Sequence, residues 1–499
     1  MNLAARLLAG AVTGAGADEA QSSAALITPT VRWTRAELAD RAARVAGAVA
    51  AAAAPDARVA ILADNDEHFV AAYLGVLAAG RIAVPLNPSA PRAELAAELA
   101  AVGATTVLTG PGHETPAAAV VPVACADATA HEPVAIAERA PTDLAVLLFT
   151  SGTAGSPKAA MLTHGNLVAN IDQVQSAPGL SIRAGDVGLG VLPFFHVYGL
   201  NVVIGLSLAA EAVLVAMPRF HPAGAVGAIR EHGITVVAAV PAIYRAWLDL
   251  DEHDAPADSF ASVRLAVSGA AALGTDTALR LRERFGLEVH DGYGLTEASP
   301  IVTTSAIGRA LRAGSIGPPI PGVEVRLVDR DGDDVLPGDP GEIIVRGDNV
   351  FAGYWNDAEQ TARVLRDGWL HTGDIAVADD DGWLSIVDRA KDLIIVSGFN
   401  VFPGEVETAL VEHDDVDEAA VVGEPDERSG ERVVAFVVAR LGSQPTPTLL
   451  TAHLRRRLAR YKIPARFEIV AELPHTFAGK VLRRALRDTA RDDAVQKPA

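Results

Sequence analysis

The first half of the chain alternates helical patterns with short apolar runs, and this alternation limits the folds open to it. Runs rich in valine, isoleucine and alanine follow helical patterns at 58–64, 81–87 and 105–110, and similar runs return at 233–241 and 263–271. Strands that alternate with helices pair in parallel, and the helices cover both faces of the sheet. We therefore expect an α/β fold built on two doubly wound sheets.

The pattern changes twice in the second half. Residues 314–347 are rich in turn-forming glycine, proline and aspartate between short apolar runs, which favours a small β-barrel or meander. From residue 392 onward, strand and helix patterns mix, with one long helix expected over 446–461 and another over 480–491. We expect an N-terminal domain over residues 1–388 and a small, mobile α+β domain over 389–499.

Charge and cysteine content narrow the class of protein. The chain has 499 residues, half of them hydrophobic, and 62 acidic against 42 basic residues give a net charge of −20. Such a surface repels nucleic acid at long range, so we expect no nucleic-acid partner. The single cysteine, Cys125, excludes an intrachain disulfide framework and favours the cytoplasm.

Two apolar stretches resemble membrane or export signals. The first 17 residues weakly resemble a signal peptide, but the apolar run is short and barely charged, so we favour an amphipathic helix. Residues 200–217 are mostly apolar but include Glu211 and are too interrupted to span a bilayer. We expect a buried helix and strand there, and no transmembrane segment.

A loop rich in glycine, serine and threonine at 150–158 is the first candidate site. It departs from the P-loop pattern because Pro157 precedes Lys158 and Ala159 follows it. Its glycines still allow an anion to approach the backbone, and its hydroxyls and lysine can bind phosphate. A plain surface loop is the alternative. The candidate binding residues are Thr150, Ser151, Gly152, Thr153, Gly155 and Lys158.

Three more segments add functional side chains. In 291–300, glycines flank Tyr293, whose ring could lie against a flat base, and Thr296 and Glu297 suit a phosphate with its Mg²⁺. Asp374, in 368–376, could accept both hydroxyls of a ribose. An ordinary turn is the alternative in each case. A third segment, 387–407, carries Arg389, Lys391 and Gly398.

The order and spacing of these four segments resemble the adenylate-forming superfamily, which includes acyl-CoA synthetases, luciferase-like enzymes and adenylation domains of peptide synthetases. The resemblance extends to 77–95 and to 473–486. Within the superfamily, "FFHVYGL", "GYGLTEASP" and "SGFNVFPGEVE" look most like bacterial fatty acyl-CoA ligases. Ala154 and Ala159 depart from the usual threonine and glycine, and the residue before Gly479-Lys480 is alanine rather than serine.

The resemblance implies a reaction in two steps. A carboxylate attacks the α-phosphorus of ATP to give acyl-AMP and pyrophosphate, and the thiol of coenzyme A then displaces AMP. The loop at 150–158 would hold the β- and γ-phosphates, and Thr150 with Glu297 would bind Mg²⁺. Thr296 would contact the α-phosphate, and Asp374 with Arg389 the ribose. The adenine would lie against Gly269, Ala270, Ala271, Asp291, Gly292, Tyr293 and Gly294.

The resemblance also implies a moving C-terminal domain. Lys480 would bridge the carboxylate and the α-phosphate during adenylation, and Lys391 would lie at the hinge about which the domain then rotates. The loop at Gly398 would flank the pantetheine arm, and His196 would gate the acyl tunnel. The alternatives are a solvated lysine for Lys480 and a packed core histidine for His196. The basic run 453–462 could contact CoA phosphates, although a solvated helix face is the simpler reading.

Substrate choice rests on residues 194–200. They offer no acidic partner for a substrate ammonium, whose unpaired burial would be costly, so an amino acid is disfavoured. We expect a medium- or long-chain fatty acid, with Gly199, Ala270 and Gly294 leaving room for its tail. Aryl or short dicarboxylic acids, transfer to a carrier protein, and a sensor without catalysis are the alternatives. The chain could be a monomer or a homodimer.

Overall fold

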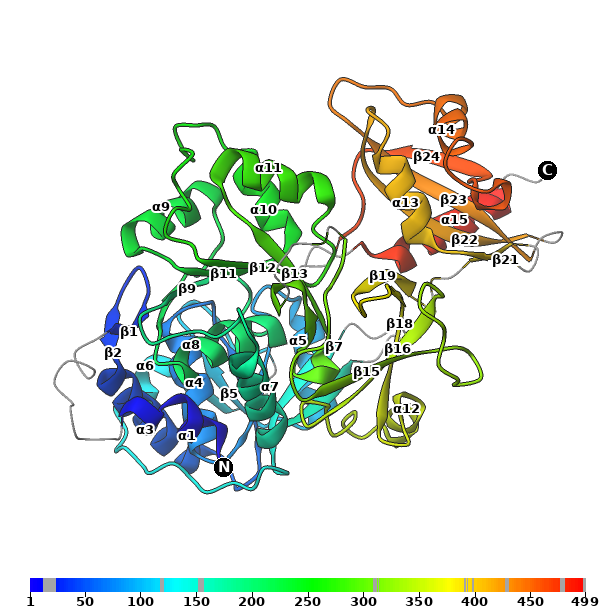
Figure 1. The fold of residues 1–499 in the computed structure, drawn as a ribbon. Helices are drawn as coiled ribbons and strands as arrows, with labels where there is room; N and C mark the ends of the chain where they lie inside the picture. Colours follow the sequence, from blue (N-terminus) through cyan, green and yellow to red (C-terminus); the bar gives the residue numbers. More distant parts are fainter. Residues whose placement is uncertain are drawn as a thin grey trace. The chain divides into compact units, whose positions relative to one another are not determined.

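The structure is a computed structural model of the 499-residue chain. It describes residues 1–11, 24–116, 121–150, 157–307, 312, 314–389, 392, 394–396, 399–426, 430–475 and 481–496. The chain divides into two compact units. The first comprises Met1–Glu324 and Val345–Leu370, and the second comprises Val325–Ile344 and His371–Ala499 (Figure 1).

A six-stranded sheet in the first unit has the order β6-β5-β3-β4-β7-β8. All its neighbouring strands are parallel except β7 and β8, which are antiparallel. The strands are β3 (Arg58–Leu62), β4 (Ile82–Pro85), β5 (Thr106–Thr109), β6 (Val121–Ala124), β7 (Leu144–Thr150) and β8 (Lys158–Thr163). Its helices are α3 (Arg35–Ala52), α4 (Glu67–Ala78), α5 (Arg92–Val102) and α6 (Cys125–Ala128).

Local sequence explains where these helices begin and why they are buried. Helix α3 starts at a capping box in which the Thr34 side chain and the Glu37 side chain each bond the other's backbone N–H. Helix α4 is capped by Asp66, whose carboxylate accepts from two backbone N–H groups. Eleven of the twelve α4 residues are buried, which matches an apolar composition on all sides.

An eight-stranded sheet, also in the first unit, has the order β14-β13-β12-β11-β9-β10-β1-β2. Its inner pairs are parallel, and β14 and β2 join antiparallel at the edges. The strands are β1 (Ala24–Ile27), β2 (Arg32–Thr34), β9 (Val187–Gly190), β10 (Val213–Ala216), β11 (Val236–Ala239), β12 (Leu265–Ser268), β13 (Val289–Gly294) and β14 (Ile301–Thr304).

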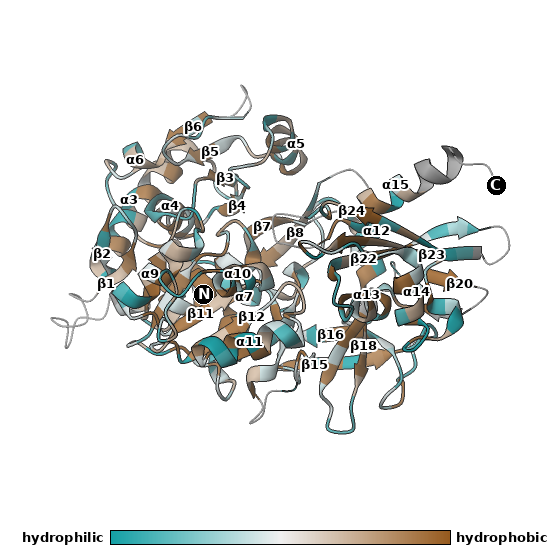
Figure 2. Ribbon diagram, turned by 90° about the horizontal axis from the view of Figure 1, so that it is seen from above, coloured by the Kyte–Doolittle hydropathy of each residue, from teal (hydrophilic) through white to brown (hydrophobic). Residues whose placement is uncertain are grey.

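Helices flank this second sheet, and Figure 2 shows apolar residues along β11 and β12 with hydrophilic residues on α11. The expected helix and strand in 200–217 are confirmed as a π-helix (η2), a short α-helix (α8) and β10. The helices of this region are α1 (Leu3–Leu7), α7 (His164–Ser176), η2 (Tyr198–Gly205), α8 (Leu206–Ala209), α9 (Pro222–His232), α10 (Pro241–Leu248) and α11 (Thr275–Phe285). Within the described ranges, every helix is too short or too polar to cross a bilayer.

The turn-rich region supplies the first two strands of a five-stranded sheet. Its order is β15-β16-β18-β17, with β19 paired to β18. This curled sheet stands where the small barrel was expected. The strands are β15 (Val323–Val328), β16 (Gly341–Gly347), β17 (Leu365–Arg366), β18 (Trp369–Ala378) and β19 (Leu384–Arg389), and helix α12 covers Ala358–Val364.

The C-terminal part of the second unit is α+β, as expected. Its sheet has the order β21-β20-β23-β22, with β24 parallel to β23. The expected helix over 446–461 is too long, because α14 ends at Leu454 and a separate 3₁₀ turn, η5, covers Arg460–Lys462. The other elements are β20 (Ile394–Val396), β21 (Phe399–Val401), α13 (Pro403–Val411), β22 (Val416–Asp426), β23 (Gly430–Ala439), β24 (Arg466–Val470) and α15 (Arg483–Gln496).

Candidate active site

The candidate phosphate loop joins two antiparallel strands whose facing ends are Thr150 and Lys158. These two residues are directly opposite each other in the β7–β8 pair. Opposed residues of an antiparallel pair project from the same face of the sheet, so the hydroxyl and the ammonium lie on one side. Between them, Ser151, Gly152, Thr153 and Gly155 lie outside the described residues and stay predictions.

A turn carrying Thr296 and Glu297 lies beside this hairpin. Both residues belong to a 3₁₀ turn, η3 (Thr296–Ala298), which packs against β8. The backbone N–H of Phe351 donates to the carbonyl oxygen of Glu297 at 2.9 Å. The structure thus brings the second predicted motif next to the strand that begins at Lys158.

Tyr354 links the two motifs and was not predicted from the sequence. Its hydroxyl donates to Glu297 Oε1 at 2.7 Å, and Lys158 Nζ lies 5.9 Å from the centroid of its ring. In the segment "FAGYWND", Tyr354 directly follows a glycine, just as Tyr293 does in "DGYG". That similarity was the only available signal, and it says nothing about which residues Tyr354 contacts.

Asp291 lies in β13 beside the strand that leads into Gly269, Ala270 and Ala271. Its register partner in β12 is Ser268, so the 269–271 segment begins next to it. Asp291 Oδ1 accepts weakly from the Leu273 N–H at 3.4 Å. Burial raises the pKa of Asp291 to about 6. The carboxylate is therefore held away from water with little compensation, which suits a group waiting for a ligand donor.

The neighbouring backbone has unusual conformations. Ala270 has a φ of +70°, a left-handed conformation that costs free energy in a residue with a side chain. Gly269 lies against Tyr198, and a Cβ built on it would lie 2.9 Å from the Tyr198 ring. Gly292 has ordinary space around it, and Tyr293 pairs with Thr303 across β13 and β14.

The expectation that Gly199 and Gly294 leave room for an acyl tail is wrong. A Cβ at Gly199 would lie 2.2 Å from the Pro193 carbonyl oxygen, and one at Gly294 would lie 2.1 Å from the Pro300 carbonyl oxygen. Backbone already fills the space beside both residues, so glycine is needed there for close packing. Neither position can widen a substrate tunnel.

His196 precedes η2 and sits in a short aromatic run. Its ring centroid lies 5.2 Å from that of Phe195, and its side chain is half-buried. Phe194 is fully buried and packs against Phe69 at 5.6 Å between ring centroids. These rings give the segment an apolar surround.

In the second unit, Asp374 and Arg389 are register partners across β18 and β19. The Asp374 side chain is buried. The preceding turn is fixed by Glu342, which accepts from the Gly373 N–H at 2.9 Å and lies 3.2 Å from His371 Nδ1. The two predicted ribose-binding residues are therefore neighbours in one sheet, although the Arg389 side chain is outside the described part.

Three further predictions cannot be placed. Lys480, Lys391 and Gly398 lie outside the described residues. In the basic run, Lys462 Nζ donates to both oxygens of Glu405 at 2.6 Å, and Arg457 donates to Glu412 at 2.7 Å. Both side chains are thus used in ion pairs within the second unit.

The residues near Glu297 fit a magnesium ion bound together with phosphate. No group of three or more His, Cys, Asp or Glu side chains gathers as a metal site in the part of the chain that the structure describes. Mg²⁺ is commonly held by one or two carboxylates and by substrate phosphates rather than by a full protein cage. Glu297, with the Thr150 hydroxyl, supplies the hard oxygen ligands that this mode needs.

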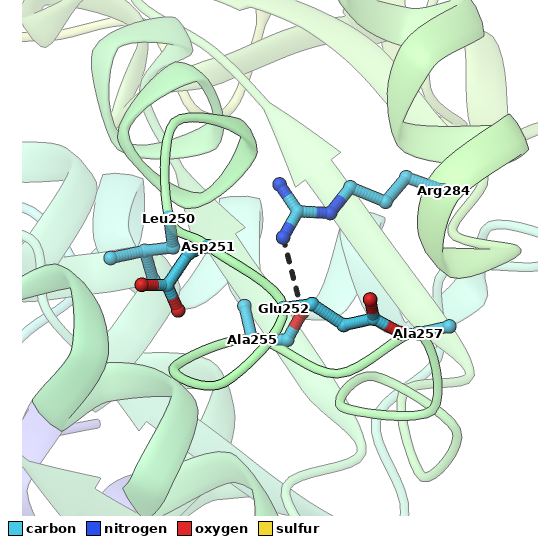
Figure 3. Close-up of a pocket in the computed structure, with 6 residues that line it drawn as sticks. All are labelled: Leu250, Asp251, Glu252, Ala255, Ala257 and Arg284. Carbon is cyan, nitrogen blue, oxygen red and sulfur yellow. Dashed lines mark hydrogen bonds between the residues drawn. The ribbon is translucent and has the colours of Figure 1, made fainter.

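A surface pocket elsewhere in the first unit has a structural explanation. It is lined by Arg284 and the loop that carries Asp251 and Ala255 (Figure 3). Arg284 donates to the carbonyl oxygens of Leu248 at 2.6 Å and of Ala255 at 3.2 Å. The guanidinium ties this loop to α11, and none of the predicted site residues lines the pocket.

Comparison with known proteins agrees with this geometry. Residues 15–355 match the family of AMP-binding enzymes, and residues 405–480 match the AMP-binding enzyme C-terminal domain. The chain belongs to the AMP-binding enzymes. Its predicted membership of the adenylate-forming superfamily is confirmed.

Individual AMP-binding enzymes resemble the chain to different extents. A long-chain-fatty-acid–CoA ligase of Escherichia coli O157:H7 is 41% identical over 357 residues, which are 71% of this chain and 63% of that protein. The chain therefore matches less than two thirds of that relative. A feruloyl-CoA synthase of an Amycolatopsis species is 38% identical over 469 residues, covering 91% of this chain and 93% of that protein.

A solved AMP-binding enzyme supports the expected fold. The ATP-bound MatB from Rhodopseudomonas palustris has a TM-score of 0.92 at 31% identity, over 99% of both chains. The predicted fold class, two doubly wound sheets with a small β-barrel and a C-terminal α+β domain, is confirmed, with the curled sheet in the place of the barrel.

Proposed function

We propose that this chain activates a carboxylic acid with ATP and transfers the acyl group to coenzyme A. In the first step, a carboxylate oxygen bonds to the α-phosphorus of ATP, and the bond to pyrophosphate breaks. In the second, the thiol sulfur of coenzyme A bonds to the acyl carbon, AMP leaves, and the thiol proton is released to solvent. The observation that carries the proposal is the hairpin with Thr150 and Lys158 at its ends, packed beside Glu297.

The site residues take the roles that their chemistry allows. Lys158 neutralises charge on the departing β- and γ-phosphates, and Mg²⁺ bound by Glu297 and Thr150 would supply further charge stabilisation. Thr296 contacts the α-phosphate. Asp291 and Tyr293 hold adenine beside the 269–271 segment.

The remaining roles belong to the second half of the chain. Asp374 and Arg389 hold the ribose, and their pairing in one sheet supports this joint role. Lys480 stabilises the charge that moves between the carboxylate and the α-phosphate. A C-terminal domain over 389–499 turns about Lys391 between the two steps and brings Gly398 to the pantetheine arm, while His196 gates entry.

A medium- or long-chain fatty acid is the first candidate substrate. The similarity to long-chain-fatty-acid–CoA ligases and the apolar surround of residues 194–200 support it. An aryl acid is the second candidate, because the similarity to feruloyl-CoA synthase runs along nearly the whole of both chains. We place the protein in the cytoplasm.

A panel of acids tests the proposal and separates its variants. The purified protein is incubated with ATP, Mg²⁺ and fatty, aryl or short dicarboxylic acids, with and without coenzyme A, and pyrophosphate and AMP are measured. We expect acid-dependent pyrophosphate, and AMP release that requires coenzyme A. No acid-dependent pyrophosphate with any acid would refute the function, and pyrophosphate without AMP release that depends on coenzyme A would favour a carrier protein as the acceptor.

A further inference from the structure

Tyr354 stands between two side chains of opposite charge in the proposed ATP site. Its hydroxyl donates to Glu297 Oε1 at 2.7 Å, while its ring lies 5.9 Å from Lys158 Nζ. A phenol can serve both neighbours, because its hydroxyl donates to an anion and its π face attracts a cation. One residue thus contacts the proposed metal-binding carboxylate and the proposed phosphate-binding ammonium.

The backbone around Tyr354 is bonded to both partners' segments. On one side, the Phe351 N–H donates to the Glu297 carbonyl oxygen at 2.9 Å. On the other, the Met161 N–H donates to the Gly353 carbonyl oxygen at 2.9 Å, and the Trp355 N–H donates to that of Ala159 at 2.8 Å. The segment 351–355 therefore ties the strand that begins at Lys158 to Glu297.

The Tyr354 side chain is also fixed in place. Its backbone N–H donates to Thr361 Oγ1 at 2.9 Å, and the Phe351 ring packs edge-on against its ring at 5.0 Å. These contacts hold the ring in the orientation in which its hydroxyl donates to Glu297 Oε1.

This arrangement keeps the charges of Lys158 and Glu297 available. Nearby opposite charges tend to pair directly, and a direct pair would have to break before phosphate and metal could bind. Among the residues that the structure describes, Glu297 accepts from the Tyr354 hydroxyl and Lys158 lies over the Tyr354 ring, and no ion pair joins the two charged side chains. Tyr354 occupies only Oε1 of Glu297, which leaves Oε2 for another ligand.

We propose that Tyr354 is a positioning residue that orients Glu297 for magnesium and holds Lys158 apart from it. This inference rests on the proposed function. It extends that function to a residue that supports a metal ligand without touching the metal. Outer partners of this kind commonly change metal affinity by about 10- to 100-fold when they are removed.

Binding of a non-cleavable nucleotide tests this role without turnover. The affinity for α,β-methylene-ATP is measured by calorimetry in Mg²⁺ and in EDTA, for the wild type and for Y354F. Y354F keeps the ring and loses the hydroxyl, so we expect about 10-fold weaker binding in Mg²⁺ and binding within about twofold of wild type in EDTA. A purely structural role would lower both affinities equally.

Two more variants isolate the partners. Adding Y354F to E297Q should weaken binding in Mg²⁺ no further than E297Q alone, because both changes remove one interaction. Y354L also removes the ring beside Lys158, so it should weaken binding in EDTA as well, by about threefold. Y73F is the matched control: the buried Tyr73 hydroxyl has no hydrogen-bond partner among the described residues, and its loss should leave both affinities unchanged.

The outcomes separate this inference from the function beneath it. If the wild type forms acid-dependent pyrophosphate and Y354F binds Mg²⁺–nucleotide as tightly as wild type, the positioning role is wrong and the function stands. Additive losses in Y354F and E297Q would also overturn the role. If the wild type binds no nucleotide under either condition, both proposals fall.

Discussion

Asp291 has its carboxylate largely removed from water in the proposed nucleotide site. Among the described residues, its hydrogen bond from the Leu273 N–H is long, at 3.4 Å, and burial raises its pKa to about 6. An ionised carboxylate in this position lowers stability until a ligand donates to it. Binding residues often carry such a cost, which the fold tolerates in exchange for affinity.

The pH dependence of stability tests this interpretation. The ordinary pKa of aspartate is 3.8 and that of Asp291 is about 6, so the folded state binds the proton more tightly and stability falls as pH rises between these values. D291N removes that loss, and we expect it to be about 1–3 kcal/mol more stable than wild type at pH 7.5 but nearly equal at pH 4. Urea unfolding at both pH values measures this.

D291N should also bind ATP several-fold more weakly, because an amide is a poorer hydrogen-bond acceptor than a carboxylate. D258N, a change at an exposed aspartate, should alter neither stability nor binding. An equal gain for D291N at both pH values would contradict the role of ionisation.

Among single elements, the 351–355 segment depends on one glycine. Gly353 has a φ of +121°, and a Cβ built on it would lie 2.6 Å from the Thr361 side chain. Thr361 is the residue whose hydroxyl accepts from the Tyr354 N–H. Position 353 is therefore restricted both by backbone conformation and by a neighbour that helps to hold Tyr354.

Replacing Gly353 by alanine should disturb this element more than the same change at a positive-φ glycine with open space around it. We expect G353A to lose about 2–4 kcal/mol of unfolding free energy, from backbone strain and from the clash with Thr361. G368A is the matched control, since Gly368 has a φ of +80° and nothing within 4 Å of the added Cβ. Its loss should be smaller, and equal losses in urea unfolding would contradict the contribution of Thr361.

The sequence pattern anticipated most elements because their apolar periods are long and clearly bounded. The apolar run at 81–87 and the helical pattern before it, for example, appear as β4 and α4. The helix over 446–461 was overextended, because arginine is a good helix former and no glycine or proline interrupts the run after Pro447. Helix α14 nevertheless ends at Leu454, before the arginines of the run.

Site residues could be predicted where a motif is local, and not where it is formed by packing. Thr150, Lys158 and Glu297 belong to short motifs with recognisable chemistry. Tyr354 acts through contacts with residues far away in the chain, and no local pattern encodes them. Gly199 and Gly294 were misread for the same reason, since only the fold shows that Pro193 and Pro300 fill the adjacent space.

At the level of the whole molecule, the proposed reaction needs one chain to present two arrangements in turn. Lys480 would serve adenylation, and the loop at Gly398 would serve thioester formation. The two steps should therefore be separable by mutation, because a substitution at one of these sites can impair its own step and leave the other step intact.

K480A should separate them. We expect adenylation, measured as acid-dependent pyrophosphate, to fall by about 100- to 1,000-fold, because a positioned charge at the reacting centre is lost. Thioester formation from supplied acyl-AMP and coenzyme A should stay within about threefold of wild type. Equal losses in both steps would contradict a specific role of Lys480 in adenylation.

The ladder between Asp374 and Arg389 limits where such a rotation can begin. These residues are paired across β18 and β19, so a pivot before Arg389 would break the backbone pairing of Asp374 with Arg389 at every turnover. A pivot after Arg389, at Lys391, would leave this pairing intact, and both proposed ribose contacts would stay in one sheet. The nucleotide could then stay bound through its ribose while the residues around its α-phosphate are exchanged.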